Sequence, residues 1–294
     1  MRVLPEPTAE PLDAADSALL RAFGEVTERR FGLWRTSRQL PSLERRLEHT
    51  LRACQLTPAQ GWSLVRTLES APETSPWVQC AANVVPNQST SFFRDAVQLQ
   101  ALIGALAGRT TQHLRLLSAG CSSGEEPYSL AMLALEGLVP LRGTQVEITG
   151  LDVSAAVLAQ AERARYAERS ISRTRELGPA GWVERWLRAD GEQYELKGAP
   201  RQMVQFVQRN LATPTALDGL GAFDAIICRN VLLYFAPDRA RQVVEALVAH
   251  LAPGGLLMLG PTEVLPEPAA PGTERVRLGP WSALRAGEGL RCAG

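Results

Sequence analysis

From about residue 79 onward, short apolar runs alternate with segments of helical periodicity. Leu99, Leu102, Ile103 and Leu106 share one helix face, and we expect further helices over 154–167 and up to Pro253-Gly254-Gly255. Such alternation is typical of a mostly parallel sheet with helices on both faces. The sequence therefore predicts an α/β, Rossmann-like fold, with a terminal hairpin in 275–285 and no clear pattern in 166–202. The expected strands are 114–118, 146–152, 203–210, 223–230 and 256–260.

Residues 16–70 lack β-rich runs and predict a small all-helical domain. Leu43, Leu47 and Leu51 recur every four residues, which makes one helix face apolar. Residues 71–77 hold two prolines and few large apolar side chains, so they are interpreted as a linker. We expect a helical N-terminal domain with its linker over 1–75 and a second domain over 76–294.

Charge and cysteine usage limit the possible functions. The chain has 31 basic and 31 acidic residues, and this balance argues against a broad nucleic-acid-binding face. Its five cysteines form no CxxC pair, so we expect no metal site. Scattered, odd-numbered cysteines and a proline-rich N-terminus without an apolar core predict a cytoplasmic protein with no signal peptide and no membrane insertion.

Ligands of open α/β sheets bind at the carboxyl ends of the strands. After the strand at 114–118 come Gly120 and Gly124, which allow close backbone approach, without the GxGxxG of dinucleotide-binding proteins. Glu125 and Glu126 follow and would repel a pyrophosphate. They suit S-adenosylmethionine, which carries an ammonium and a sulfonium. The alternative is that both acids only complement the helix dipole.

The later strand ends carry further polar groups. Asp152 is placed to accept hydrogen bonds from ribose hydroxyls, although an acid here also serves as a helix cap. Asn210 and Asn230 could contact an adenine edge or a methionine tail, or could simply form turns. Upstream, residues 88–95 combine polar groups with two phenylalanines, which is equally compatible with a helix start anchored by apolar side chains.

These motifs resemble the CheR-type chemotaxis receptor (protein-glutamate) O-methyltransferase family. The matching segments follow the family's order over about residues 88–263, and the tail TERVRLGPWSALRA resembles the family's last hairpin. They are QSTSFFRD, AGCSSGEEPYSLAM, LDVSAAVLAQA, RNLATP, FDAIICRNVLLYF and LAPGGLLMLGPTE. The resemblance implies a class I methyltransferase sheet, S-adenosylmethionine as cofactor, S-adenosylhomocysteine as product, and glutamates of chemoreceptor cytoplasmic helices as substrate.

The resemblance also implies residue roles. Arg94 and Tyr234 match positions that hold the incoming glutamate and the transferring methyl group. Glu126 matches the acid near the methionyl ammonium, and Asp152 the ribose-binding acid. The full set of implied cofactor-binding residues is Gln88, Thr90, Arg94, Glu126, Asp152, Asn210, Leu211, Arg229 and Asn230.

Three positions depart from the family pattern. Gln88 stands where the family usually has Asn, with Asn87 just before it. Pro261 replaces the family's His in the segment GPTE, and Ser154 replaces an Asp. The first two departures leave open an alternative function as a non-catalytic methyltransferase-like scaffold in a chemosensory pathway.

Two further enzyme classes fit less well. A nicotinamide dehydrogenase would need the missing GxGxxG. A methyltransferase acting on base amino groups would often carry [DN]PP[YF] where this chain has Arg229-Asn230-Val231-Leu232. A carboxylate is already ionised near neutral pH, so its methylation needs no strong general base. We therefore expect no catalytic His or Cys, and interpret Cys121 and Cys228 as structural.

The N-terminal half is rich in arginine. Arg45 and Arg52 lie seven apart and share a helix face, and Arg38 extends the line if the helix begins before Pro41. We expect these three residues to dock an acidic receptor helix, with the chain acting as a monomer. The alternative is a solvated arginine face balanced by Glu44 and Glu48.

Overall fold

The computed structural model describes residues 14–33, 40–83, 89–109, 113–136, 145–172, 175–264 and 270–289. The chain divides into two units, Met1–Val84 and Val85–Gly294. The division falls after 84, whereas the linker was expected at 71–77. Ser75 is instead the N-cap of a helix that has Pro76 in its first turn, a position where proline costs no hydrogen bond.

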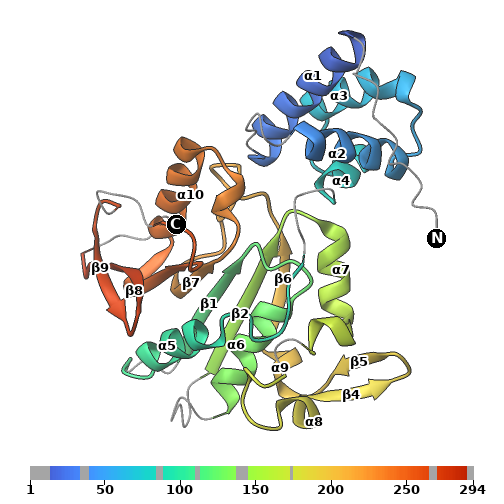
Figure 1. The fold of residues 1–294 in the computed structure, drawn as a ribbon. Helices are drawn as coiled ribbons and strands as arrows, with labels where there is room; N and C mark the ends of the chain where they lie inside the picture. Colours follow the sequence, from blue (N-terminus) through green and yellow to red (C-terminus); the bar gives the residue numbers. More distant parts are fainter. Residues whose placement is uncertain are drawn as a thin grey trace, which may run out of the picture. The chain divides into compact units, whose positions relative to one another are not determined.

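The described part of the first unit is helical (Figure 1). The predicted helix face is confirmed, since Leu43, Leu47 and Leu51 are buried. Arg30 donates to the carbonyl oxygens of Leu68 and Ala71 and so closes the C-terminal end of a neighbouring helix. The helices are α1 (Ala14–Phe31), α2 (Leu40–Ala53), α3 (Gly61–Ser70) and α4 (Pro76–Ala82).

The second unit is built on a seven-stranded sheet with the order β6-β2-β1-β7-β8-β10-β9. If the strands of this sheet alone are numbered along the chain, their order is 3-2-1-4-5-7-6. The first five, 3-2-1-4-5, follow the order of the doubly wound fold. The first five are parallel, and β10 pairs antiparallel with β8 and β9. The Rossmann-like class I methyltransferase sheet is confirmed. Its strands are β1 (His113–Ala119), β2 (Gln145–Asp152), β6 (Val204–Gln208), β7 (Phe223–Cys228), β8 (Leu251–Leu259), β9 (Thr273–Leu278) and β10 (Trp281–Ala286).

Side chains that alternate along each strand fill two cores, one on each face of this sheet. Ala225 and Ile227 of β7 pack into the core that includes α5 and α6, whereas Ile226 and Cys228 pack into the core that includes α10. Every residue of β7 is buried, as expected for a central parallel strand. The flanking helices are α5 (Ala96–Leu106), α6 (Glu125–Leu135), α7 (Ala155–Arg163) and α10 (Pro237–Ala249).

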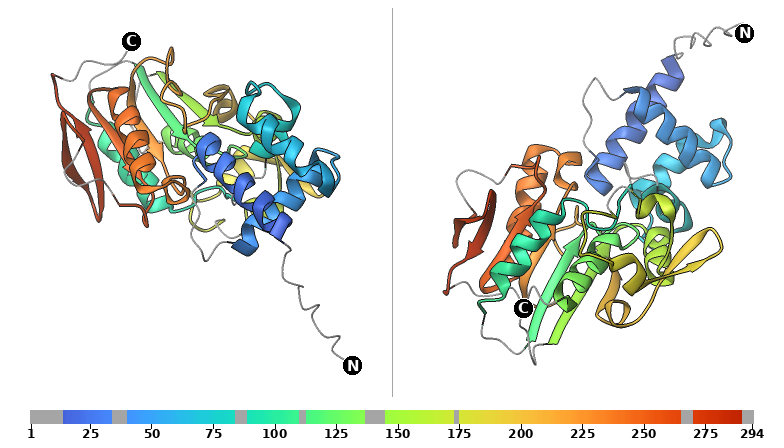
Figure 2. Two further views of the ribbon diagram at one scale, coloured as in Figure 1. Left: turned by 90° about the horizontal axis from the view of Figure 1, so that it is seen from above. Right: turned by 60° about the horizontal axis from the view of Figure 1, so that its bottom comes forward.

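The unassigned region 166–202 contains a second, three-stranded antiparallel sheet with the order β3-β5-β4. This small sheet and the β9–β10 hairpin lie at opposite edges of the large sheet, which both views of Figure 2 show from other sides. Its elements are β3 (Arg165–Ala167), α8 (Trp182–Trp186), β4 (Leu187–Asp190), β5 (Gln193–Leu196) and α9 (Ala199–Gln202).

Two expected helix boundaries are wrong. The helix expected over 154–167 ends at Arg163, because Ala164 is left-handed with φ 54° and the chain turns there into β3. Pro253-Gly254-Gly255 does not end a helix but lies inside β8. A Cβ on Gly255 would lie 2.9 Å from the carbonyl oxygen of Phe223, so glycine there permits close approach of two strands.

Within the described ranges, no helix combines the length and the apolar character that a membrane span needs.

Candidate active site

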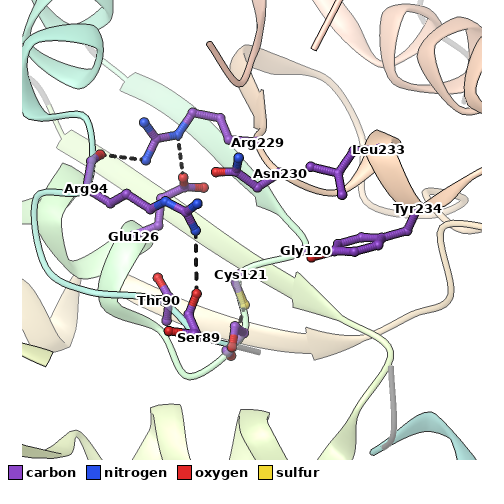
Figure 3. A pocket seen from close by; sticks show the side chains of 11 residues that line it. Ser89, Thr90, Arg94, Gly120, Cys121, Glu126, Arg229, Asn230, Leu233 and Tyr234 are labelled. Atoms are coloured by element: carbon purple, nitrogen blue, oxygen red, sulfur yellow. Dashed lines mark hydrogen bonds and ion pairs between the residues drawn. The ribbon is translucent and has the colours of Figure 1, made fainter. Parts of the chain in front are cut away.

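A pocket of about 210 Å³ lies where β1 and β7 end, within the second unit (Figure 3). The strand register brings these ends together, since Ser118 of β1 pairs with Ile227 of β7. The lining residues come from the turn before α5, the loop after β1, the start of α6 and the segment after β7. They are Ser89, Thr90, Arg94, Gly120, Cys121, Ser122, Glu126, Arg229, Asn230, Leu233 and Tyr234.

The loop after β1 is held close to its neighbours by glycines. Gly120 has φ 80°, and a Cβ there would lie 2.4 Å from Cγ2 of Val231. Its N–H donates to the carbonyl oxygen of Leu151 at 2.7 Å. Gly124 has φ 92° and is the N-cap of α6. A bulkier residue at Gly120 would push apart the two segments that line the pocket.

Glu126 is fixed at the floor of the site by two hydrogen bonds. Ser118 Oγ donates to one carboxylate oxygen at 2.7 Å, and Arg229 Nε donates to the other at 2.7 Å. Arg229 is almost fully buried and also donates to the carbonyl oxygen of Arg94 and to Gln98 Oε1. Arg229 is thereby neutralised and held, and it links the ends of β7, α6 and the turn before α5.

The turn that carries Thr90 and Arg94 is anchored in the core. Phe92 and Phe93 are fully buried, and their rings lie 5.3 Å and 4.7 Å from the ring of Trp182. Phe93 and Asp95 have positive φ values of 54° and 52°, so packing holds a strained backbone beside the pocket. The apolar anchor that the sequence left open as an alternative is present, although Asp95 at the N-cap of α5 makes no side-chain capping hydrogen bond, and Arg94 lines the pocket (Figure 3).

Asp152 lies beside the pocket rather than in its lining. Its carboxylate accepts N–H groups from Ser122 at 2.9 Å and from Ser154 at 3.0 Å. Burial raises the pKa of the Asp152 carboxyl, and these hydrogen bonds oppose the rise. Asp152 thus fixes a pocket-lining loop, and its remaining lone pairs are the ones that could accept ribose hydroxyls.

Six of the predicted cofactor and catalytic residues meet in the pocket: Thr90, Arg94, Glu126, Arg229, Asn230 and Tyr234. Asn210 and Leu211 do not line it. Asn210 Oδ1 accepts the N–H of Ala212, which is the turn contact that the sequence left open. Gln88 and Arg38 lie outside the described residues, and Arg45 and Arg52 belong to the other unit. The roles of all these residues stay predictions.

The two cysteines near the site are poor nucleophiles. Burial raises the pKa of the Cys121 and Cys228 thiols well above the usual value, with further contributions from neighbouring carboxylates. Both thiols therefore stay protonated at neutral pH, in line with a structural role.

Two acidic side chains support the site in ways that the sequence did not predict, and neither lines the pocket. Glu125 is buried and accepts hydroxyl groups of Ser123 and Ser170, which ties the second sheet's segment to the loop after β1. Glu263 follows β8 and accepts backbone N–H groups from the pocket-lining segment after β7. In the segment GPTE the sequence pointed only to Pro261. The contacts of Glu263 reach residues about thirty positions earlier in the chain, and such contacts leave no local sequence pattern.

The family model described as CheR methyltransferase, SAM binding domain, matches residues 88–276. The chain belongs to the CheR methyltransferase family. The matched residues include the whole pocket, so the site described above lies in the SAM-binding domain of a CheR protein.

Several curated proteins are similar to this CheR chain. Chemotaxis protein methyltransferase 2 of Vibrio cholerae is 35% identical over 63% of the chain and 65% of its own length. Chemotaxis protein methyltransferase 1 of Pseudomonas aeruginosa is 34% identical over 64% of the chain and 70% of its length. Probable biofilm formation methyltransferase WspC of Pseudomonas putida is 34% identical over 82% of the chain and 55% of its length. The chain thus spans between 55% and 70% of their lengths.

Proposed function

We propose that the chain transfers a methyl group from S-adenosylmethionine to side-chain carboxylates of glutamates on a chemoreceptor. The observation that carries the proposal is the chemistry of the pocket. A carboxylate, Glu126, and a side-chain guanidinium, Arg94, both line it beside the glycine loop that follows β1. The Glu126 acid and the Arg94 cation suit the ammonium and carboxylate of a methionyl tail, and the Glu126 carboxylate disfavours a phosphate-bearing ligand.

S-adenosylmethionine supplies an electrophilic methyl group when it is bound. Arg94 would hold the incoming glutamate, whose oxygen would bond to the methyl carbon as the carbon–sulfur bond breaks and its electron pair stays on sulfur. The products are a methyl ester and S-adenosylhomocysteine. Because charge is neutralised as the bond forms, the protein contributes mainly by positioning and by excluding water.

The described side chains supply that positioning. Arg94 is half-buried at the pocket, where its guanidinium can pair with the incoming glutamate. Tyr234 lines the opposite side, next to Gly120 in Figure 3, where its hydroxyl can contact the reacting groups. Glu126 and Arg229 hold each other rigidly, so neither side chain needs to reorganise when the ligands bind.

The proposed partner is the cytoplasmic helical region of a chemoreceptor, which places the reaction in the cytoplasm. Arg45 and Arg52 on α2 are exposed. Arg52 is 3.8 Å from Glu48, a weak surface ion pair that a stronger partner can displace. Replacing Arg38, Arg45 and Arg52 with Glu should raise the KM for receptor and leave S-adenosylhomocysteine affinity intact. An unaltered KM at low salt would remove this surface from the proposal.

The pathway of the receptor has two candidates. Relatives named for chemotaxis and one named for biofilm formation both match the chain, the latter over 82% of it. The chemistry proposed for the pocket is the same in both cases.

A non-catalytic scaffold is the alternative function. Calorimetry with S-adenosylhomocysteine separates the two, because an enzyme must bind this product and a scaffold that has lost its site gives no heat. We expect saturable binding at one site. Absence of binding by a folded chain would favour the scaffold.

A further inference from the structure

The carboxylate of Glu263 accepts N–H groups from four consecutive residues. Its Oε2 accepts from Asn230 at 2.8 Å, and its Oε1 accepts from Val231, Leu232 and Leu233 at 2.9, 2.7 and 3.3 Å. Oε2 also accepts the N–H of Gly260 at 2.8 Å. All five of these donors are backbone N–H groups, so backbone dipoles stabilise the negative charge of Glu263.

These bonds restrain a segment that needs restraint. Asn230 is left-handed with φ 59°, and the short 3₁₀ helix η4 (Leu232–Tyr234) begins two residues later. The first N–H groups of any helix have no acceptor within the helix, and the oxygens of a carboxylate can accept their hydrogen bonds. On its other side the segment touches the loop after β1, where a Cβ at Gly120 would collide with Val231. The segment is thus held between Glu263 and Gly120.

The restrained segment carries Asn230, Leu233 and Tyr234, three of the pocket-lining residues, whereas Glu263 itself does not line the pocket. We propose that Glu263 is a positioning residue, whose carboxylate sets the placement of Asn230 and Tyr234 for methyl transfer. The proposal rests on the proposed function for its effect on catalysis, but the restraint itself can be tested without any activity.

Both carboxylate oxygens are required for this arrangement. An ionised carboxylate only accepts hydrogen bonds, so each oxygen can serve several N–H donors. In Glu263→Gln, one oxygen becomes an amide NH₂, which would point a donor at backbone donors. At least two of the five hydrogen bonds are then lost, while size and shape are nearly unchanged.

Peptide-level hydrogen exchange tests the restraint. In Glu263→Gln we expect the backbone amides of 230–233 to exchange at least about tenfold faster than in the wild type, because at least two of the hydrogen bonds that restrain the segment are lost. The matched control is Glu274→Gln, which removes an exposed carboxylate of the same unit that pairs with Arg285. The control should leave exchange in 230–233 unchanged. Unchanged exchange in Glu263→Gln would overturn the proposal.

A double-mutant cycle tests the effect on catalysis. Glu263→Gln should lower kcat at least about tenfold, with the Kd for S-adenosylhomocysteine changed less than about threefold. In the Glu263→Gln background, Tyr234→Phe should then lower kcat less than about twofold, because the Tyr234 hydroxyl is already misplaced there. A double variant whose loss in kcat equals the product of the two single losses would show that Glu263 does not act through Tyr234. If the wild type transfers no methyl group, the proposed function fails, and hydrogen exchange still decides on the restraint.

A second variant covers the case in which Glu263→Gln does not fold. A Cβ on Gly260 would lie 2.7 Å from Glu263 Oε2. Gly260→Ala should therefore shift the Glu263 carboxylate away from its N–H donors without changing Glu263 itself. We expect faster exchange in 230–233 and a lower kcat in this variant as well. Wild-type exchange in a folded Gly260→Ala protein would contradict the assigned role.

Discussion

Arg229 and Glu126 form a buried ion pair, with 2.7 Å between Nε and Oε2 and with only 2% and 12% of their side chains exposed. The pair joins the end of β7 to the first turn of α6. Asp95 adds a second carboxylate 3.5 Å from Arg229 Nη1. Because a buried charge is costly without its partner, this contact should matter for folding as well as for the pocket.

Arg229→Ala should therefore destabilise the chain. Loss of the guanidinium leaves Glu126 without its cation, which typically costs about 3–5 kcal/mol. Thermal unfolding should show a fall in Tm of roughly 6–20 °C at about 2–4 °C per kcal/mol. The matched control is Arg285→Ala, which breaks the exposed pair with Glu274 and should cost at most about 1 kcal/mol. Equal effects of the two changes would contradict the structural role of Arg229.

Asp152→Ala should weaken S-adenosylmethionine binding by roughly ten- to a hundredfold, the scale of one or two charge-assisted hydrogen bonds. Part of the loss would come from freeing the Ser122 N–H. Ser154→Ala separates this loss from effects on α7, because it removes the side-chain cap to the Val157 N–H and leaves the Asp152 carboxylate in place. We expect calorimetry to show near wild-type affinity for Ser154→Ala. Full affinity in folded Asp152→Ala would remove Asp152 from the binding site.

Tyr234→Phe should lower turnover by about tenfold with a smaller change in cofactor affinity, because the hydroxyl is placed to act on the reacting groups. Steady-state kinetics and calorimetry on the same preparation measure the two effects. Arg94→Ala should reduce both, since Arg94 is assigned to glutamate and cofactor alike. A Tyr234→Phe enzyme with normal kcat would exclude a catalytic role for the hydroxyl.

Glu125→Gln should change how stability depends on pH. Burial raises the pKa of the Glu125 carboxyl above its usual value, although hydrogen bonds from Ser123 and Ser170 oppose the rise. The folded chain then keeps a proton at pH values where the unfolded chain has lost it. The contribution of Glu125 to the free energy of unfolding is present at low pH and falls as pH rises through the folded-state pKa.

A glutamine at position 125 can keep both serine contacts and carries no charge. The difference in Tm between Glu125→Gln and wild type should therefore increase from pH 5 to pH 8 in favour of the variant. Comparing the two proteins cancels the titration of all other groups. A difference independent of pH would show that Glu125 titrates alike in the folded and unfolded chain.

Strand and helix patterns predicted the central fold because burial there is regular. Residues 223–228 are apolar except for Asp224, and the structure buries all of them in the middle of the sheet. The second sheet escaped prediction because its strands are three or four residues long and most of their residues are exposed or only partly buried. Such short strands show no period that can be read from the sequence.

The candidate site was partly predictable for a similar reason. Glu126 lies at the start of the helix after β1 and Asn230 in the segment after β7, so their meeting at one edge of the parallel sheet follows from topology. Glu263 also follows a strand, yet its role depends on where its carboxylate lies relative to backbone donors of residues 230–233. Contacts of this kind are set by tertiary packing and leave no signal in local sequence.

The most direct test of the central claim is radiolabelled methyl transfer from S-adenosylmethionine to chemoreceptor cytoplasmic fragments. A glutamate methyl ester is hydrolysed by mild base, whereas methyl groups on nitrogen are not. The account predicts label that is released as methanol by base, and that is lost when the receptor's methylated glutamates are replaced with alanine. Base-stable label, or no label from a chain that binds S-adenosylhomocysteine, would contradict it.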